Sequence, residues 1–184
     1  MRNVDRSGVR ARTRAAAMCS GVLLTLILGG CAPTTSVISV TAATTESKAA
    51  QDAETFEQQY AKYVSLPLDE ISEDDLTPLL TGDLLAESTK EIADTRERGT
   101  QVIGKYTYSR FAVTDQGIEA SGQAYMVAQA CLDVTGSRIH DSSGIDITPD
   151  RDPLVSMQLK AVTVDDGSWR ISDAVRNDEV KACD

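Results

Sequence analysis

The chain has 184 residues, enough for one domain of ordinary size, and carries 18 Lys and Arg residues against 28 Asp and Glu, a net charge of −10. Its first 14 residues hold five of the arginines and one acid, which leaves 13 basic against 27 acidic residues in the remainder. Such a surface repels the phosphates of nucleic acids, so we expect no nucleic-acid partner.

The N-terminal segment is typical of a secretory signal peptide. A basic stretch ends at Arg14, and an apolar stretch then covers residues 15–30. This stretch is shorter than the roughly 20 apolar residues that a spanning helix needs, and it contains Ser20 and Gly21. Both observations favour a signal peptide over a permanent transmembrane helix.

The residues that follow resemble the lipobox of bacterial lipoproteins. Leu28-Gly29-Gly30-Cys31 places an aliphatic residue and two small residues directly before a cysteine. The resemblance implies that residues 1–30 are removed and that Cys31 becomes a lipidated N-terminus, held at the extracytoplasmic face of the cell membrane by its acyl chains. The alternative is an ordinary signal peptide followed by an unmodified cysteine.

Residues 31–45 are predicted to form a flexible tether between the lipidated cysteine and the domain. After Cys31 the segment is rich in Thr, Ser and Ala, has no charge and shows no sustained period, so it cannot bury a core. Its threonines are candidates for O-glycosylation in an exported protein. We expect a single folded domain over residues 46–184.

Two of the four cysteines remain for the domain once Cys19 leaves with the signal and Cys31 carries lipid. These are Cys131 and Cys183, an even pair in a compartment that permits disulfides. We expect a bridge that ties the C-terminal tail to the sheet. Two independent thiols are the alternative.

The first part of the domain has helical periodicity. Apolar residues recur at three- and four-residue spacing over residues 45–66, and Pro67 ends that pattern. After an acidic connection, a second helical region covers residues 77–97, which Gly82 is expected to break or kink. Gly99 is a natural C-terminal stop.

After Gly99 the apolar period changes from 3.6 to 2, which predicts strands. We expect strands at 101–114, 118–134, 154–164 and 168–175, turns at 115–117 and 165–167, and a long polar loop at 135–152 with short strand pieces near Ile139 and Ile145. Helices followed by strands predict an α+β fold, with the N-terminal helices packed on one face of a curved, cone-like antiparallel sheet of about four strands.

This order of elements resembles the nuclear-transport-factor-two-like fold, also called the ketosteroid-isomerase-like cone. The segment Asp166-Gly167-Ser168-Trp169-Arg170-Ile171 is similar to the closing hairpin of that superfamily, and the LTGDLLAE and GTQVIG stretches are similar to small exported actinobacterial lipoproteins. The resemblance covers roughly residues 46–176. It implies a conical domain with a pocket between the sheet and the helices, and it implies no particular chemistry.

No residue pattern in the chain predicts a catalytic, metal or cofactor site. His140 is the only histidine, and its pairing with Asp141 or Asp133 as a base competes with an exposed loop position. The acidic DITPDRD stretch lacks the EF-hand pattern for calcium, and one histidine with two paired cysteines does not make a zinc site. We therefore predict no catalytic residue, metal or cofactor.

The aromatic residues supply the candidates for a pocket. If the domain is a cone, its pocket would be lined by Tyr60, Tyr106, Tyr108, Tyr125 and Trp169; otherwise these side chains fill the core or the strand faces. The function that fits best is a membrane-anchored, non-enzymatic binding or accessory module for an envelope protein or a small apolar ligand. The alternative is an enzyme of the ketosteroid-isomerase-like type that uses the cone pocket.

Overall fold

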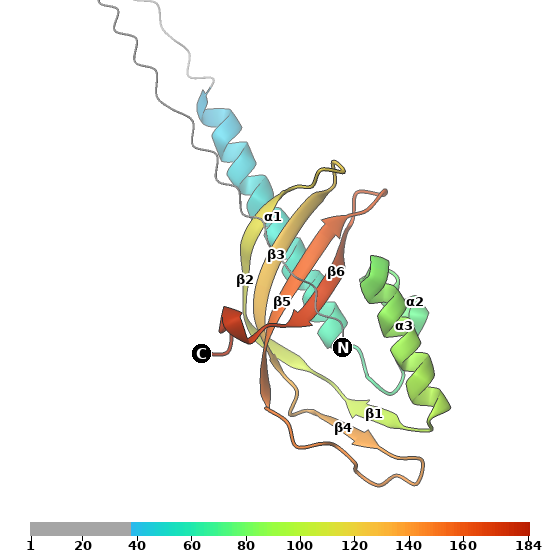
Figure 1. Ribbon diagram of the computed structural model, residues 1–184. Coiled ribbons are helices and arrows are strands. Elements are labelled where there is room, and N and C mark those ends of the chain that lie inside the picture. The colour runs from blue at the N-terminus through green and yellow to red at the C-terminus, as the bar shows by residue number, and fades with distance from the viewer. Residues whose placement is uncertain (1–37) are drawn as a thin grey trace, which may run out of the picture. The chain divides into compact units, whose positions relative to one another are not determined.

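The computed structural model describes the backbone of residues 38–184 and side chains from Lys48 onward. The predicted signal peptide, Cys31 and the first part of the tether lie outside the described residues. The described part is an α+β domain, as predicted, with helices followed by antiparallel sheets (Figure 1). Its helices are α1 (Ile38–Val64), α2 (Glu73–Leu76), α3 (Gly82–Glu97) and the short 3-10 helix η1 (Asp178–Val180).

The strands form two antiparallel sheets. The larger has the order β2-β3-β5-β6, and β1 and β4 make a separate two-stranded ribbon. The bounds are β1 (Gln101–Gly104), β2 (Thr107–Ile118), β3 (Ala124–Asp133), β4 (Ser137–His140), β5 (Leu154–Thr163) and β6 (Trp169–Arg176). The larger sheet is thus the predicted sheet of about four strands.

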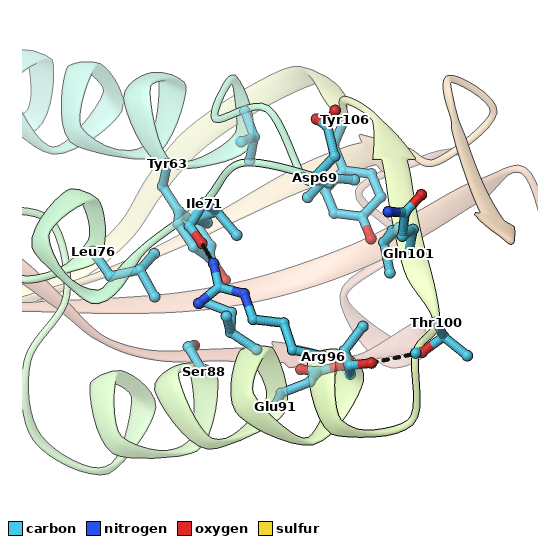
Figure 2. Close-up of a pocket in the computed structure, with 16 residues that line it drawn as sticks. Tyr63, Asp69, Ile71, Leu76, Ser88, Glu91, Arg96, Thr100, Gln101 and Tyr106 are labelled. Carbon is cyan, nitrogen blue, oxygen red and sulfur yellow. Dashed lines mark hydrogen bonds between the residues drawn. The ribbon is translucent and has the colours of Figure 1, made fainter. Parts of the chain in front are cut away.

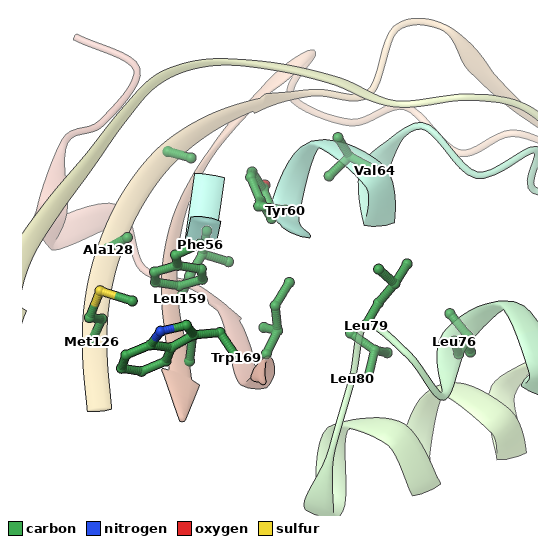
Figure 3. Close-up of a cluster of buried hydrophobic side chains, with 13 residues drawn as sticks. Phe56, Tyr60, Val64, Leu76, Leu79, Leu80, Met126, Ala128, Leu159 and Trp169 are labelled. Atoms are coloured by element: carbon green, nitrogen blue, oxygen red, sulfur yellow. The ribbon is translucent and has the colours of Figure 1, made fainter. Parts of the chain in front are cut away.

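Helix α1 lies across one face of the larger sheet and contacts both of its edge strands, β2 and β6 (Figure 1). Phe56, Tyr60 and Val64, spaced four residues apart, bury the same side of the helix. They pack against alternate residues of the central strands, such as Met126 and Ala128 on β3 (Figure 3). These alternate residues form the inward face of β3.

The sheet curves around α1 because β2 is bulged twice. Its register with β3 shifts between Ser109 and Ala112 and again between Val113 and Asp115, and each shift inserts one extra residue. Arg110, inside the first bulge, has a φ of 54°. Next to it, Phe111 meets Phe56 edge-on, with ring centroids 5.3 Å apart.

Helix α1 begins earlier than predicted. It starts at Ile38, inside the segment assigned to the flexible tether, whereas the periodicity predicted a start near residue 45. Residues 38–45 contain neither Gly nor Pro, so a helix held by packing farther along the chain extends back through them at little cost per residue. Low polarity without a period was a weak sign of a flexible coil.

The second helical region is shorter than predicted, and Gly82 does break it. Residues 77–81 are not helical. Leu80 forms a parallel bridge with Ile171 of β6, and Thr81 donates its N–H to the carbonyl of Ile171 (2.9 Å). The acidic connection holds the extra helix α2, which starts at a capping box between Ser72 and Asp75.

One predicted turn is wrong and one is confirmed. Residues 115–117 lie inside β2, and the chain reverses at 119–123, where Gly122 has a φ of +87°. Gly117 marks a close approach instead, because an added Cβ would lie 3.0 Å from the Tyr125 ring. The turn at 165–167 is confirmed: Val164 and Ser168 pair across it (2.9 Å) and Gly167 has a φ of +79°.

The C-terminal tail is fastened to the sheet face opposite α1. A disulfide joins Cys183 to Cys131 on β3, with Cα atoms 4.8 Å apart, which confirms the expected bridge. The main-chain N–H of Cys183 also donates to the Ser156 hydroxyl (3.2 Å), and that of Asn177 to the Ser156 carbonyl (2.9 Å). The tail is therefore ordered by β3 and β5 together.

Candidate functional site

A cavity of about 460 Å³ lies between the C-terminal end of α1, the loop that follows it, helix α3 and strand β1 (Figure 2). Its walls come from segments between Tyr63 and Tyr106 that the fold brings together. It is lined by Tyr63, Val64, Leu68, Asp69, Ile71, Leu76, Ser88, Glu91, Ile92, Thr95, Arg96, Gly99, Thr100, Gln101, Val102 and Tyr106.

Helix α3 roofs this cavity because it is held mainly at its two ends. Before its N-terminus, the buried residues Leu79 and Leu80 fix the chain to β6. Near its C-terminus, the Arg96 guanidinium donates to the carbonyl of Ile71 (2.8 Å), in the loop after α1. No residue of α3 is fully buried, and Ser88 and Ile92 on its inner side border the cavity.

Strand β1 forms the wall opposite α1 through a close contact with the β4 side of the ribbon. Gly104 ends β1 with a φ of +89°, and a Cβ there would lie 2.1 Å from the carbonyl oxygen of Gly136. The carbonyl of Gly104 in turn accepts the N–H of Leu68 (3.2 Å), another residue of the lining. One glycine thus joins the ribbon to the loop that borders the cavity.

The polar groups of the cavity gather around Tyr63. Burial raises the pKa of its hydroxyl above the ordinary value, a hydrogen bond with Ser88 lowers it in part, and the nearby Tyr106 and Glu91 raise it further. These groups come from α1, α3 and the link between β1 and β2. At neutral pH Tyr63 is therefore a neutral hydroxyl that can donate or accept a hydrogen bond in the cavity.

Of the aromatic candidates, Tyr106 is the one that lines this cavity. Tyr60 is 1% exposed and packs edge-on against Tyr108, with ring centroids 5.0 Å apart, in the core beneath α1. Tyr125 and Trp169 line a different depression of about 450 Å³, between α1 and the ends of β2 and β3. The structure therefore does not bring the predicted pocket residues together.

The second depression is bordered by two polar contacts of those aromatic side chains. The indole Nε1 of Trp169 donates to Asp52 on α1 (3.3 Å), and the Tyr125 hydroxyl donates to Asp115 (3.1 Å). The hydrogen bond and the charge of Asp115 raise the pKa of Tyr125 above its ordinary value. The Trp169 indole N–H and the Tyr125 hydroxyl therefore already have hydrogen-bond partners within the domain.

Sequence reasoning missed most of the residues that line the cavity, among them Ser88, Glu91 and Arg96 on α3. A signal was present: Ser88, Ile92 and Thr95 recur at helical spacing on one stripe, so polar and apolar residues mix on the side that should bury a core. A stripe of this kind is typical of a helix that faces a solvated cavity.

The remaining sequence candidates are engaged in local contacts. His140 is the last residue of β4 and forms an isolated antiparallel β-bridge with Asp146. The Asp141 carboxylate accepts hydrogen bonds from the main-chain N–H groups of Ser143 (2.8 Å) and Ile145 (3.0 Å) in the turn that follows. Among the described residues, no three His, Cys, Asp or Glu side chains gather closely enough to hold a metal ion. No helix in the described part of the chain is long and apolar enough to cross a membrane.

A scan against protein-family models finds no match for this chain, and a search of curated proteins finds no significant one. Solved structures are similar to part of this chain. One is the intermembrane-space region of the chloroplast protein ARC6, with 20% identity and a TM-score of 0.49 over 68% of this chain and 94% of that one. Another is a periplasmic fragment of TraM, with 17% identity and a TM-score of 0.43 over 69% and 96%. These scores are too low to assign a function or a location.

Proposed function

We propose that the protein is a lipid-anchored, extracytoplasmic binding module that takes a small, largely apolar ligand into the cavity beneath α3. The anchor is supported by the lipobox-like sequence that ends at Cys31. The ligand is supported by the cavity, which is the observation that carries the proposal. Its volume of about 460 Å³ falls in the range of roughly 300–1,000 Å³ that is usual for small-molecule sites.

The lining has the composition that ligand sites generally share. Apolar side chains supply contact area, and a few polar groups on α1 and α3 are placed to fix the orientation of a ligand. The apolar residues of the lining are Val64, Leu68, Ile71, Leu76, Ile92 and Val102. A ligand seated there would add apolar contacts beneath α3 and would hold that helix more firmly against the domain.

We further propose that the chain is a diverged nuclear-transport-factor-two-like lipoprotein that works beside a protein of the cell envelope. The order of helices before a curved sheet and the Asp166-Gly167-Ser168-Trp169 hairpin support the family. A short tether supports the proposal of an envelope-protein partner, because it would keep the domain near the membrane surface.

The anchor is tested by Cys31→Ala in the full chain, expressed in a bacterium that processes lipoproteins. We expect the variant to lose acyl labelling and to leave the membrane fraction on washing, because one acylated cysteine is the whole attachment. Cys131→Ala is the matched control and should keep the label. A variant that stays with washed membranes would show that the lipobox interpretation is wrong.

The cavity is tested by filling it. Ser88→Trp places a large side chain in the space under α3, whereas Glu87→Trp adds the same group at an exposed position of the same helix that does not line the cavity. With the neutral dye N-phenyl-1-naphthylamine as the probe, we expect saturable binding to the unchanged protein and to Glu87→Trp, and at least about tenfold weaker binding to Ser88→Trp. Equal binding by both variants would place the dye elsewhere and would contradict the proposal.

A further inference from the structure

The charges in the cavity beneath α3 do not balance. Asp69, Glu91 and Arg96 are the charged residues of its lining. Within residues 48–184, Arg96 forms no ion pair with either carboxylate, and its hydrogen bond goes to the main-chain carbonyl of Ile71. The lining therefore presents one negative charge in excess, in a chain that is itself strongly acidic.

Several side chains of the lining offer oxygen atoms as hydrogen-bond acceptors to the cavity. Tyr63, Glu91 and Tyr106 all line this cavity (Figure 2). Carboxylate and hydroxyl oxygens accept hydrogen bonds from an ammonium group, and tyrosine rings attract cations to their faces. These groups suit a positively charged head group better than a negative one.

The same cavity also offers apolar contacts. Leu76 is 1% exposed, and Ile71 and Ile92 are half-buried against the core beneath α1. An alkyl or aryl group seated against Ile71 and Ile92 would remove water from its own surface and from theirs, which is favourable in proportion to the apolar area covered. A ligand with a charged head and an apolar tail would use both kinds of contact.

We propose that the ligand of this cavity is a small amphipathic cation, with an ammonium head at Glu91, Tyr63 and Tyr106 and an apolar tail against Ile71, Leu76 and Ile92. This inference rests on the proposed function and narrows it to one chemical class. The negative field of the whole domain adds to the selection, because it raises the local concentration of cations and lowers that of anions.

Three probes with the same decyl chain separate the head-group charge from the apolar contact: decyltrimethylammonium, decanol and decanoate. Each is titrated into residues 37–184, which form one compact unit, and binding is followed by calorimetry. We expect decyltrimethylammonium to bind at least about fivefold more tightly than decanoate, as unpaired exposed carboxylates contribute modestly. Decanol should lie between them. Decanoate binding as tightly as the cation would overturn the inference.

Two glutamates on α3 provide a matched pair of variants. Glu91→Gln removes a cavity carboxylate, and Glu87→Gln removes an exposed one that does not line the cavity. We expect only Glu91→Gln to weaken the cation, by about fivefold, while decanol binding stays the same. Equal effects of both variants would contradict the inference. If none of the three probes binds, the proposed function fails as well, whereas decanol binding without a charge preference rejects the cation alone.

Discussion

The hydroxyl of Tyr60 is buried without a hydrogen-bond partner in the part of the chain that the structure describes. The side chain is 1% exposed and lies among the aromatic rings of Tyr108 and Phe111. Burial is the main reason that its pKa is raised far above the ordinary value of 10.0, and the nearby hydroxyls of Tyr63 and Tyr108 act in the same direction. The ring therefore contributes to the core, while the hydroxyl brings a desolvation cost.

Replacement of this residue by phenylalanine tests that assignment. We expect Tyr60→Phe to leave the free energy of unfolding near pH 7 unchanged or to raise it by about 1 kcal/mol, since no hydrogen bond is lost. A raised folded-state pKa stabilises the fold fully below the unfolded value of 10.0, and this stability is lost as the pH rises above it.

The advantage of Tyr60→Phe should therefore grow between about pH 9 and about pH 11 in urea unfolding followed by Trp169 fluorescence. Tyr106→Phe, which changes a residue of the cavity lining, is the control for general effects of alkaline pH. A loss of more than about 1 kcal/mol near pH 7 would show that the Tyr60 hydroxyl has a partner after all.

At the scale of single residues, the sequence predicted burial better than it predicted the site. Met126, Ala128 and Ala130, at alternate positions of the strand predicted at 118–134, are all buried. The sequence did not separate Tyr106 in the cavity from Tyr60 in the core, because both are aromatic residues on amphipathic elements. The distinction depends on how α3 and β1 are placed, and that placement is set by contacts distant in the chain.

Among the elements, the β1–β4 ribbon depends on one glycine. Gly104 has a positive φ, and a Cβ at this position would lie 2.1 Å from the Gly136 carbonyl oxygen. We expect Gly104→Ala to lower the free energy of unfolding by at least about 2 kcal/mol, through backbone strain and this clash. Gly144→Ala shares the positive φ but meets no atom within 4 Å, so it should cost less.

Urea unfolding of both variants measures this difference, and hydrogen exchange locates it. The exchange of β1 amides, such as that of Val102, should speed up in Gly104→Ala and stay unchanged in Gly144→Ala. If the two alanine variants lose equal stability, the close contact between Gly104 and Gly136 does not contribute.

The C-terminal tail is the second element with a defined support. The Cys131–Cys183 bridge closes a segment with a sequence separation of 52, for which the chain-entropy relation gives about 4 kcal/mol at most. We expect the double variant Cys131→Ser, Cys183→Ser to lose about 2–4 kcal/mol in urea unfolding, and reductant to lower the stability of the unchanged protein only. Two reactive thiols in the folded, unreduced protein would contradict the bridge.

Local patterns predicted most elements but not their junctions. The Asp-Gly turn at 166–167 was clear because its flanking strands alternate and its glycine supplies a positive φ. The 115–117 segment carries similar residues, yet Gly117 lies inside β2, where the absence of a side chain lets the Tyr125 ring pack closely against it. A glycine in a strand and a glycine in a turn have the same sequence signature, and only the pairing with β3 distinguishes them.

At the scale of the whole molecule, α1 connects the two parts of the proposed function. Its 27 residues correspond to about 40 Å of helix. Its first turn follows the predicted lipid-bearing segment in the chain, and its last turn, with Tyr63 and Val64, lines the cavity. The core between these ends holds the helix against the sheet, so the shape of the cavity wall depends on the same packing that stabilises the domain.

The most direct test of the binding account is to map where a ligand contacts the domain. Decanol is titrated into isotope-labelled residues 37–184, and amide chemical shifts are followed by NMR. The account predicts saturable shifts concentrated at the C-terminal end of α1, the inner side of α3 and β1, with Tyr63, Ile92 and Val102 among them. Shifts centred on the depression beside Lys48 and Trp169, or no saturable shifts at all, would contradict it.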